Sequence, residues 1–282
     1  WLPHHDKTLL FDGYQFHSYP HSDKHIQRLS QVIENPIGEI WSFYTKEHEN
    51  HFSRKTMGLA NWDQKRWIQY DIQEIQSANI ELNDRFFPIA KGRVLFLLCD
   101  CLMLFEADSR KSTLMKDVQE THLETFLHLV PNRMGGYYIS GKNGIAKIQI
   151  DPQFPKSTLI WEEFLFNPEW QIQNIININV DSSGDIYATV IQNNKQKLLT
   201  KFSNDNWEIL YISEENNLKN GWAGEGKSFW VLEGEERIRY IDDQEQNTIN
   251  DEPGLSVYIN QHSYDDVNGG FSHVATAKPK YS

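Results

Sequence analysis

Histidine is the residue type in this chain whose distribution best suits chemistry, because imidazole binds metals and changes its charge near neutral pH. Seven of the eleven histidines fall within the first 51 residues, and six of them come as three close pairs: His4 and His5, His21 and His25, His48 and His51. This grouping suits a metal site, a pH-sensitive surface or donors for a polar ligand, although ordinary polar loops carry histidine as well. The spacing in His48-Glu-Asn-His51 differs from that of the His-Glu-x-x-His zinc motif.

Two tryptophans form a second candidate set, because each has amides or acids beside it. Trp170 follows Asn167 and Glu169, and Trp222 lies close to Asn220. An aromatic ring flanked by such groups suits stacking against a sugar, with hydrogen bonds to its hydroxyls. The other reading is that both rings are packing residues, as we expect for the remaining strand tryptophans.

Few other residues suggest chemistry. Cys99-Asp-Cys101 could hold a soft metal, but two cysteines this close more often serve as small, half-buried residues. The acid pairs, such as Asp242-Asp243, fall at predicted turns, where solvated charge is expected. The chain has neither a Gly-x-Ser-x-Gly elbow nor a glycine-rich phosphate loop. The sequence therefore predicts no catalytic residue, no metal site and no cofactor.

The secondary-structure elements that must position these residues can be predicted from a sequence repeat. A turn ending in glycine is followed by a short aromatic strand, a gap, a second short strand and an aromatic third strand. The turn glycines are Gly38, Gly92, Gly136, Gly184, Gly226 and Gly270. Their spacing runs from 42 to 54 residues and averages about 46, which is the length of one four-stranded propeller blade. The sequence therefore predicts an all-β fold, a β-propeller of four-stranded antiparallel blades.

Six blades are favoured over seven, and the two ends of the chain are predicted to close the ring. The segments Thr8–Phe11 and Gln15–Tyr19 read as strands C and D of the first blade. A strand near Val257–Val267 and another at Phe271–Thr276 would complete it as strands A and B. Trp1–Lys7 could instead be a truncated strand B, in which case the parent ring has seven blades. We expect residues 1–282 to be a single domain within a longer receptor.

Propeller topology gives the candidate residues a place. Connections from strand B to C and from strand D to the next strand A emerge on one face of a propeller. All three histidine pairs, Trp170, Trp222 and Cys99-Asp-Cys101 fall in or near such connections. Loops on one face are where ligand-binding residues gather. We predict that the ligand-binding residues are His21, His25, His48, His51, Trp170 and Trp222.

Composition excludes several classes of partner. The formal net charge of −12 disfavours nucleic acid and anionic lipid, since both need a basic face. No stretch reaches the roughly 18 apolar residues of a membrane helix, so we expect no membrane contact by this chain. Leu114 to His128 has a weak helical spacing, but it crosses a predicted blade junction. A low cysteine content suits a periplasm or a cytoplasm alike.

The repeat resembles that of the two-component regulator propellers. The matching segments are Leu10–Tyr19, Gly58-Leu-Ala-Asn-Trp-Asp63 and Asp181-Ser-Ser-Gly-Asp-Ile-Tyr187. They follow the family pattern Asp-x-x-Gly-x-[Leu/Ile]-Trp, a gap, then Gly-Leu-x-[Arg/Lys]-[Phe/Trp]-Asp. The family's Gly-Thr after the aromatic is replaced by Ser42-Phe43 and by Ala188-Thr189, and blades 3 and 6 lack the Gly-Leu entry to strand C.

The resemblance implies an extracytoplasmic sensor domain of bacterial hybrid histidine kinases and related receptors. We therefore expect a periplasmic or extracellular, non-enzymatic propeller whose partner is a small molecule, an oligosaccharide or another propeller, with a homodimer as one arrangement. Any kinase or cyclase activity would lie outside this chain. The rival functions are a metal-dependent propeller hydrolase or lactonase and a protein–protein interaction scaffold, since one fold supports all three.

Overall fold

The structure is a computed structural model of the 282-residue chain. It describes residues 2–3, 7–11, 15–20, 26–35, 37–48, 51–78, 85–132, 135–151, 158–224, 226–234, 237–241, 246–249, 264–265 and 271–272. The chain divides into two compact units, Trp1–Leu129 with Gln149–Ile160 and Val130–Ile148 with Trp161–Ser282. The expectation of one domain over residues 1–282 stays a prediction.

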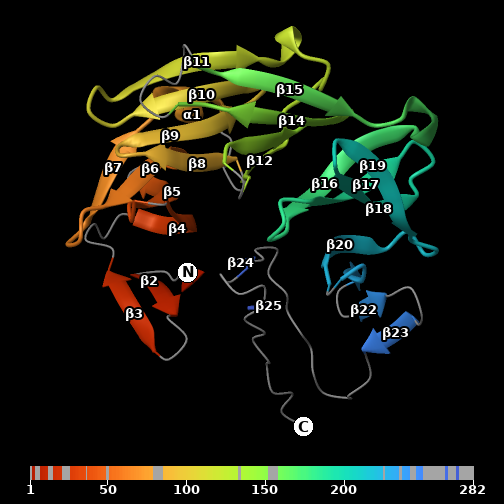
Figure 1. The fold of residues 1–282 in the computed structure, drawn as a ribbon. Coiled ribbons are helices and arrows are strands. Elements are labelled where there is room, and N and C mark those ends of the chain that lie inside the picture. Colours follow the sequence, from red (N-terminus) through yellow and green to blue (C-terminus); the bar gives the residue numbers. More distant parts are fainter. Residues whose placement is uncertain are drawn as a thin grey trace. The chain divides into compact units, whose positions relative to one another are not determined.

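Five four-stranded antiparallel sheets correspond to predicted blades 2 to 6 (Figure 1). Blade 2 contains β4 (Ile26–Glu34), β5 (Ile40–His48), β6 (His51–Trp62) and β7 (Trp67–Asp71). Blade 3 contains β8 (Phe86–Ala90), β9 (Arg93–Leu98), β10 (Cys101–Glu106) and β11 (Lys111–Asp117). Blade 4 contains β12 (His128–Pro131), β13 (Tyr137–Ser140), β14 (Gly144–Gln149) and β15 (Ile160–Leu165). Blade 5 contains β16 (Ile172–Val180), β17 (Ile186–Gln192), β18 (Lys197–Ser203) and β19 (Asn206–Ile212). Blade 6 contains β20 (Leu218–Ala223), β21 (Phe229–Glu233), β22 (Arg237–Ile241) and β23 (Gln246–Ile249).

In each of these sheets the strands lie in chain order, so they are strands A to D of the predicted blade. From the repeat, the sequence predicts strands at Trp67–Asp71, Tyr137–Ser140 and Arg237–Ile241, and the structure has strands with these bounds. Inner strands are buried on both faces: Ile186 to Val190 of β17 are all buried. The outer strand β19 carries exposed Glu208, Ile209 and Ile212. Burial therefore decreases from the inner to the outer strand of a blade. An inner strand packs between neighbouring sheets, whereas an outer strand lies at a sheet edge and meets solvent.

The turn glycines explain the period. Gly38, Gly92, Gly136, Gly184 and Gly226 all have positive φ, between 63° and 91°, a region that glycine enters without a Cβ clash. In blade 2 the side chain of Asn35 closes the turn by accepting hydrogen bonds from the backbone N–H groups of Ile37 and Glu39. Asp181 does the same in blade 5 for Ser183 and Asp185. The repeat therefore specifies a turn between strands A and B.

Apolar side chains pack between neighbouring sheets within each unit. In the first unit, Trp41, Phe43 and Leu59 of blade 2 form one cluster with Phe96 and Phe105 of blade 3. In the second unit a smaller cluster joins blades 5 and 6; it contains Tyr187, Leu199, Leu218, Phe229, Val231 and Ile241. These inter-sheet layers are the core of the protein.

Helix is confined, in the described residues, to α1 (Gln73–Ala78) and the short 3-10 turns η1 (Val118–Glu120) and η2 (Pro168–Trp170). The segment Leu114–His128 contains the end of β11, η1 and the start of β12, so its weak helical spacing formed no α-helix. None of the described helices has the length and apolar content needed to cross a membrane.

The ends of the chain contribute two small sheets. At the start, β1 (Leu2–Pro3), β2 (Lys7–Phe11) and β3 (Phe16–Pro20) form a three-stranded sheet. Near the end, β24 (Tyr264–Asp265) and β25 (Phe271–Ser272) pair with each other. The place next to β2 that ring closure assigns to a C-terminal strand is taken by β1. This pairing agrees with the alternative of a truncated strand B, while the number of blades stays a prediction.

Candidate functional site

The D–A and B–C connections of the second unit hydrogen-bond to one another, so they lie at one edge of their sheets. Between β15 and β16, the carbonyl of Trp170 accepts from Nε2 of Gln192 at 2.7 Å, and the carbonyl of Gln171 accepts from the N–H of Asn193 at 2.9 Å. Between β19 and β20, the carbonyl of Asn217 accepts from the N–H of Gly234 at 2.8 Å. This is the edge on which the sequence placed its candidate residues.

A cleft of about 330 Å³ opens at this edge between blades 5 and 6. Its lining comes from consecutive residues of β19, from the connection that follows β19, and from β22: Ile209, Leu210, Tyr211, Ile212, Glu214 and Arg239. Residues Thr200 and Leu199 of β18 pair with Ile209 and Tyr211, so Leu210 is an extra residue, a β-bulge, in β19. A bulge bends an edge strand and turns its side chains, here beside the cleft.

A buried carboxylate lies against the cleft. Glu233 at the end of β21 is only 3% exposed. Its Oε1 accepts from the hydroxyl of Tyr211 at 2.8 Å and from Oγ of buried Ser213 at 3.3 Å. Its Oε2 lies 3.2 Å from Nε of Arg239. A carboxylate removed from water needs such partners, because an uncompensated buried charge costs several kcal/mol, of order 3 to 5.

Arg239 is an ion-pair partner of Glu233 that still has donors available. The Nε–Oε2 approach is close enough for an ion pair, but Nε is buried without a hydrogen-bond acceptor among the described residues. No described residue accepts a hydrogen bond from the rest of this guanidinium, whose side chain is 26% exposed. A planar group with several unused N–H donors, lining a cleft, suits a ligand carboxylate.

Tyr211 reports the electrostatics of the site. Burial, the hydrogen bond to Glu233 and the charge of Glu233 raise the pKa of its phenol to about 12. The nearby Arg239 acts in the opposite direction, and Glu214 adds to the increase in pKa. Tyr211 is therefore a neutral hydrogen-bond donor at physiological pH, fixed in place by Glu233.

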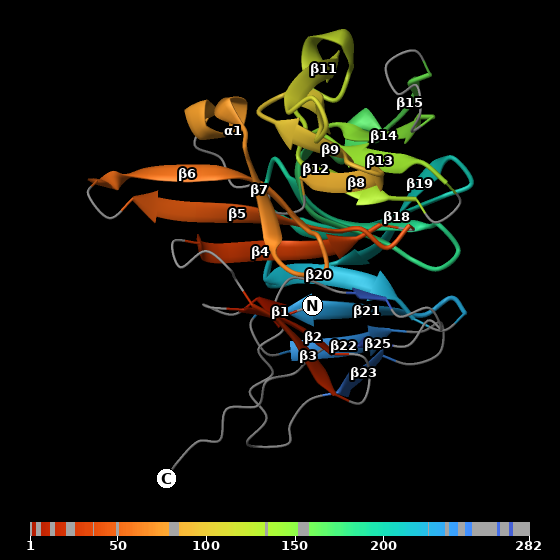
Figure 2. The ribbon, with the colours of Figure 1, turned by 90° about the vertical axis from the view of Figure 1, so that its left-hand side faces the viewer.

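Of the four histidines predicted to bind a ligand, the structure describes the backbone of His48 and His51. His21 and His25 lie outside the described residues. His48 and His51 end β5 and begin β6, where the backbone register pairs them directly across the hairpin. The sequence suggested a long B–C loop that contains both histidines, and this expectation is wrong. The pairing of β5 with β6 continues up to His48 and His51, so only two residues separate the two strands. The hairpin extends past the end of β7, whose pairing with β6 stops at Gly58 (Figure 2).

Trp170 lies in the D–A connection as expected, at the end of η2. Asn167 caps this turn by accepting from the N–H of Glu169 at 3.0 Å. The indole of Trp170 is half-buried, and its centroid lies 6.3 Å from that of Phe166, which in turn packs on Trp207 at 4.5 Å. Trp170 thus extends an aromatic layer between blades 4 and 5, with part of its ring exposed.

Trp222 lies elsewhere than expected. It belongs to strand A of blade 6, not to the connection before it, and is only 7% exposed. Its backbone pairs with Trp230 of β21. Nearby, Nδ2 of Asn179 on β16 donates to Oδ1 of Asn220 at 2.7 Å, linking two neighbouring A strands. The alternating pattern of Leu218–Ala223 is weak, which is why the sequence did not reveal the strand.

The cysteines do not have the properties of a metal site. Cys99 is exposed in the turn between β9 and β10, and Sγ of Cys101 donates to Oδ2 of Asp117 at 3.7 Å. Burial and the charge of Asp117 raise the pKa of the Cys101 thiol, so the thiolate that binds metals is disfavoured. Within the described residues, no three His, Cys, Asp or Glu side chains gather as a metal site would require.

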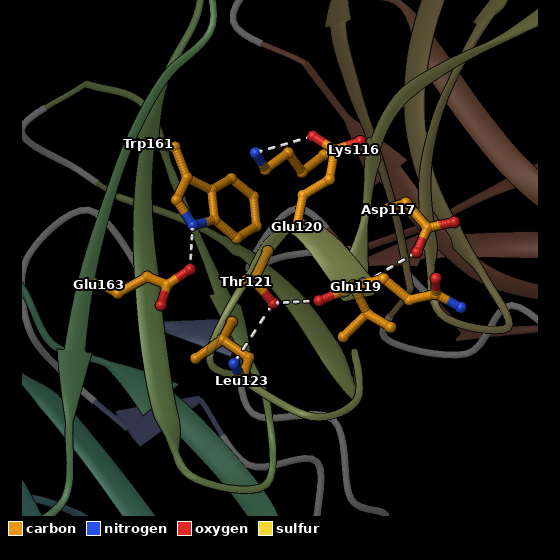
Figure 3. Close-up of polar contacts among 9 residues, drawn as sticks. Lys116, Asp117, Gln119, Glu120, Thr121, Leu123, Trp161 and Glu163 are labelled. Atoms are coloured by element: carbon orange, nitrogen blue, oxygen red, sulfur yellow. Dashed lines mark hydrogen bonds and ion pairs between the residues drawn. The ribbon is translucent and has the colours of Figure 1, made fainter.

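The D–A connection after blade 3 satisfies its polar groups locally (Figure 3). The Asp117 carboxylate accepts from the N–H of Gln119, and Lys116 pairs with Glu120 at 3.0 Å. Thr121 donates to the carbonyl of Val118 at 2.7 Å and accepts from the N–H of Leu123. On β15, Nε1 of Trp161 donates to Oε1 of Glu163 at 2.6 Å. These contacts hold local structure and leave no comparable arrangement of unused donors.

No protein-family model matches this chain, and no curated protein sequence matches it. Solved structures do resemble it. Virginiamycin B lyase from Staphylococcus aureus matches with a TM-score of 0.56 at 11% identity, over 88% of this chain and 78% of the lyase. Extracellular domains from B. thetaiotaomicron match as well: that of the one-component system BT4673 with a TM-score of 0.55 at 13% identity, and that of the hybrid two-component system BT3049 with a TM-score of 0.53 at 13% identity.

The chain has a β-propeller fold. Identities this low concern the fold alone, and at that level the resemblance to two-component regulator propellers is confirmed. The two B. thetaiotaomicron matches include 95% and 94% of this chain. They include only 38% and 35% of the B. thetaiotaomicron chains. It therefore spans less than half of the receptor domains that it resembles.

The residues around the cleft were missed by the sequence analysis. In the sequence, Glu233 directly follows the apolar run Phe229–Leu232 and precedes the acid pair Glu235-Glu236, where a turn is predicted. Arg239 falls in the middle of strand C, where alternation with Ile238 and Tyr240 suggests a solvated face. The available signal is the cross-strand register, because Arg239 pairs with fully buried Val231 and must share its face.

Proposed function

We propose that this chain is the ligand-sensing propeller domain of a bacterial transmembrane signalling receptor, non-catalytic and located in the periplasm or outside the cell. The observation that carries the proposal is the cleft at the D–A edge of blades 5 and 6, with Arg239 and Tyr211 in its lining. The fold shared with extracellular domains of bacterial one- and two-component systems supports it.

The residues of the cleft suit binding of a ligand better than chemical conversion of it. Oε1 of the buried carboxylate Glu233 accepts from Tyr211 and Ser213, and Oε2 forms an ion pair with Arg239, so both oxygens have partners within the fold. A general base needs a lone pair directed at its substrate. The exposed donors of Arg239 and the aliphatic walls instead offer orientation and apolar contact, as in a binding pocket.

The test is a thermal-shift screen of the purified chain against small metabolites and oligosaccharides, followed by mass spectrometry of each ligand that raises the unfolding midpoint. A bound ligand recovered unchanged after long incubation supports the sensor. Turnover of the ligand, or a stoichiometric metal in elemental analysis together with activity that chelation removes, would instead establish the metal-dependent hydrolase or lactonase.

A partner surface is the second candidate function. Aliphatic side chains remain exposed on outer strands of the blades: Ile160 is 61%, Leu165 45% and Ile212 50% exposed. Exposed aliphatic residues on edge strands favour contact with another propeller or a second copy of the chain. Light scattering over a range of concentrations tests this, since Leu165→Ser should weaken any dimer, while Glu208→Ser at an exposed polar residue of β19 serves as a control.

The hairpin and the connection before blade 5 remain proposed binding segments. If His48 and His51 contact the ligand or partner, its affinity changes between about pH 5.5 and 7.5, around the ordinary histidine pKa of about 6.5. Replacing both by Gln, together with His21 and His25, should abolish that change. Trp170→Ala should weaken binding of an oligosaccharide if the exposed part of its ring stacks on a sugar.

A further inference from the structure

The chemistry of the cleft points to a class of ligand. The guanidinium of Arg239 has donors that no described residue satisfies, and its ionic partner among the described residues, Glu233, is held at its other oxygen by Tyr211 and Ser213. Arginine presents its N–H groups in a planar fork that matches a carboxylate in two parallel hydrogen bonds. The ligand group facing Arg239 is therefore an oxygen acceptor, best a carboxylate.

A simple anion does not fit the rest of the lining. Glu233 already balances the charge of Arg239, and the exposed carboxylate of Glu214 gives the lining a further negative charge. Glu214 and Arg239 both line the cleft beside Tyr211, so the cleft presents two opposite charges. A ligand that satisfies both needs an anionic and a cationic group.

The other lining residues of the cleft are aliphatic: Ile209, Leu210 and Ile212. Ile209 and Ile212 are 36% and 50% exposed, and Leu210 lies between them in sequence. At about 330 Å³ the cleft is at the small end of the range for small-molecule sites, roughly 300 to 1,000 Å³. Its occupant is thus a small molecule with an apolar body, since burying exposed aliphatic surface contributes binding energy.

We propose that this cleft binds a free apolar α-amino acid, with its carboxylate on Arg239, its ammonium on Glu214 and its side chain against Ile209 and Ile212. The inference rests on the proposed sensor function and names the ligand class of the same site. It assigns each of the three features of the lining one complementary group of the ligand.

Isothermal titration calorimetry of the whole chain with L-leucine, L-methionine and L-phenylalanine tests the proposal. At least one should bind, whereas its N-acetyl derivative, which lacks the ammonium, and its amide, which lacks the carboxylate, should each bind at least about tenfold more weakly. An amino acid that binds no better than both derivatives would overturn the assignment of the two charges.

Two variants with matched controls locate the site. Arg239→Lys retains the positive charge beside Glu233 but loses the planar fork, so affinity should fall about tenfold. Arg237→Lys, two residues away and paired with Glu215 at 4.0 Å, should change nothing. Glu214→Gln should weaken the amino acid but not its N-acetyl derivative, while Glu215→Gln is its control. Thermal midpoints of all four variants check that each is folded.

The outcomes separate this inference from the function on which it rests. If none of the three amino acids binds at millimolar concentration, the ligand class is wrong. If another ligand then raises the midpoint of the wild type but not of Arg239→Lys, the cleft still senses a ligand of a different class. If a ligand binds and none of the cleft variants affects it, the sensor function stands and the site is elsewhere. If nothing in the screen binds, both proposals fail.

Discussion

Two interfaces between neighbouring blades, here called seams, are packed by different kinds of side chain. The seam between blades 2 and 3 is filled by aromatic rings: Phe105 packs on Trp41 and Tyr70 at 6.5 and 5.3 Å between centroids. The seam between blades 5 and 6 is apolar around Phe229 and Val231, but at its D–A edge it contains the buried carboxylate Glu233 and the cleft.

Carboxylates cross both seams, at different places. In the first, Glu39 follows the turn glycine of blade 2 and accepts from the N–H of Gly92 in the turn of blade 3, at 3.0 and 3.2 Å, and from the indole of Trp41 at 3.3 Å. In the second, Glu233 engages Tyr211 and Arg239 next to a cleft. Glu39 binds a backbone N–H and so joins two blades. Glu233 pairs with a partly exposed arginine, which it holds in the lining of the cleft.

The largest effect should come from emptying the aromatic seam. Phe105→Ala removes a ring that is 2% exposed, leaving a cavity that the flanking sheets cannot close, so unfolding free energy should fall by about 3 to 5 kcal/mol. Chemical denaturation measures this. Leu114→Ala, at a residue 45% exposed on the neighbouring strand, should stay within about 0.5 kcal/mol. Equal losses for the two variants would contradict a packed seam.

In the second seam, Arg239→Ala should cost about 2 to 3 kcal/mol, because Glu233 stays buried with only its hydroxyl partners. The estimate is below that for a fully buried pair, since the Arg239 side chain is 26% exposed. Arg237→Ala is the control: its partner Glu215 is 66% exposed and the pair should be nearly neutral in denaturation experiments. A stable Arg239→Ala protein would show that Glu233 does not need this ion pair.

Glu39→Ala should have a smaller effect, about 1 to 2 kcal/mol, because it leaves the N–H of Gly92 and the indole of Trp41 without their acceptor. Glu39→Gln retains a carbonyl oxygen at the same place and should recover part of the loss. If Gln is as damaging as Ala, the charge and not the hydrogen bonds holds this turn.

The smallest effect concerns pH. The folded pKa of Tyr211 is raised to about 12, above the ordinary tyrosine value of about 10. Its neutral form is therefore the one that the fold stabilises, and that contribution is fully present below about pH 10 and lost as pH rises through about 12. Tyr211→Phe should make the alkaline loss of stability less steep in denaturation curves at pH 9 to 12. An unchanged slope would mean that other tyrosines, such as Tyr137, account for it.

Local features of the sequence predicted the turns of the blades, but they did not predict every strand. The turn pattern predicted six four-stranded blades, and five four-stranded sheets are present in the described residues, because glycine at positive φ and an Asn or Asp closing the turn are local requirements. The histidine hairpin was read as a loop, because its largely polar sequence lacks the apolar alternation that marks a strand. Trp222 was expected in or near a connection, while the pairing of its backbone with Trp230 places it in strand A of blade 6.

The sequence by itself determined the period, the turns, the four-stranded repeat and the aromatic layers, since each depends on residues close together in the chain. Only the tertiary structure decided that Glu233 and Arg239 on neighbouring strands would meet Tyr211 of the preceding blade, 22 residues before Glu233. A buried charge, its partners and a cleft depend on the register between strands and on the packing of one sheet against the next. No local pattern encodes that register, because the energy that fixes it is shared among many distant contacts.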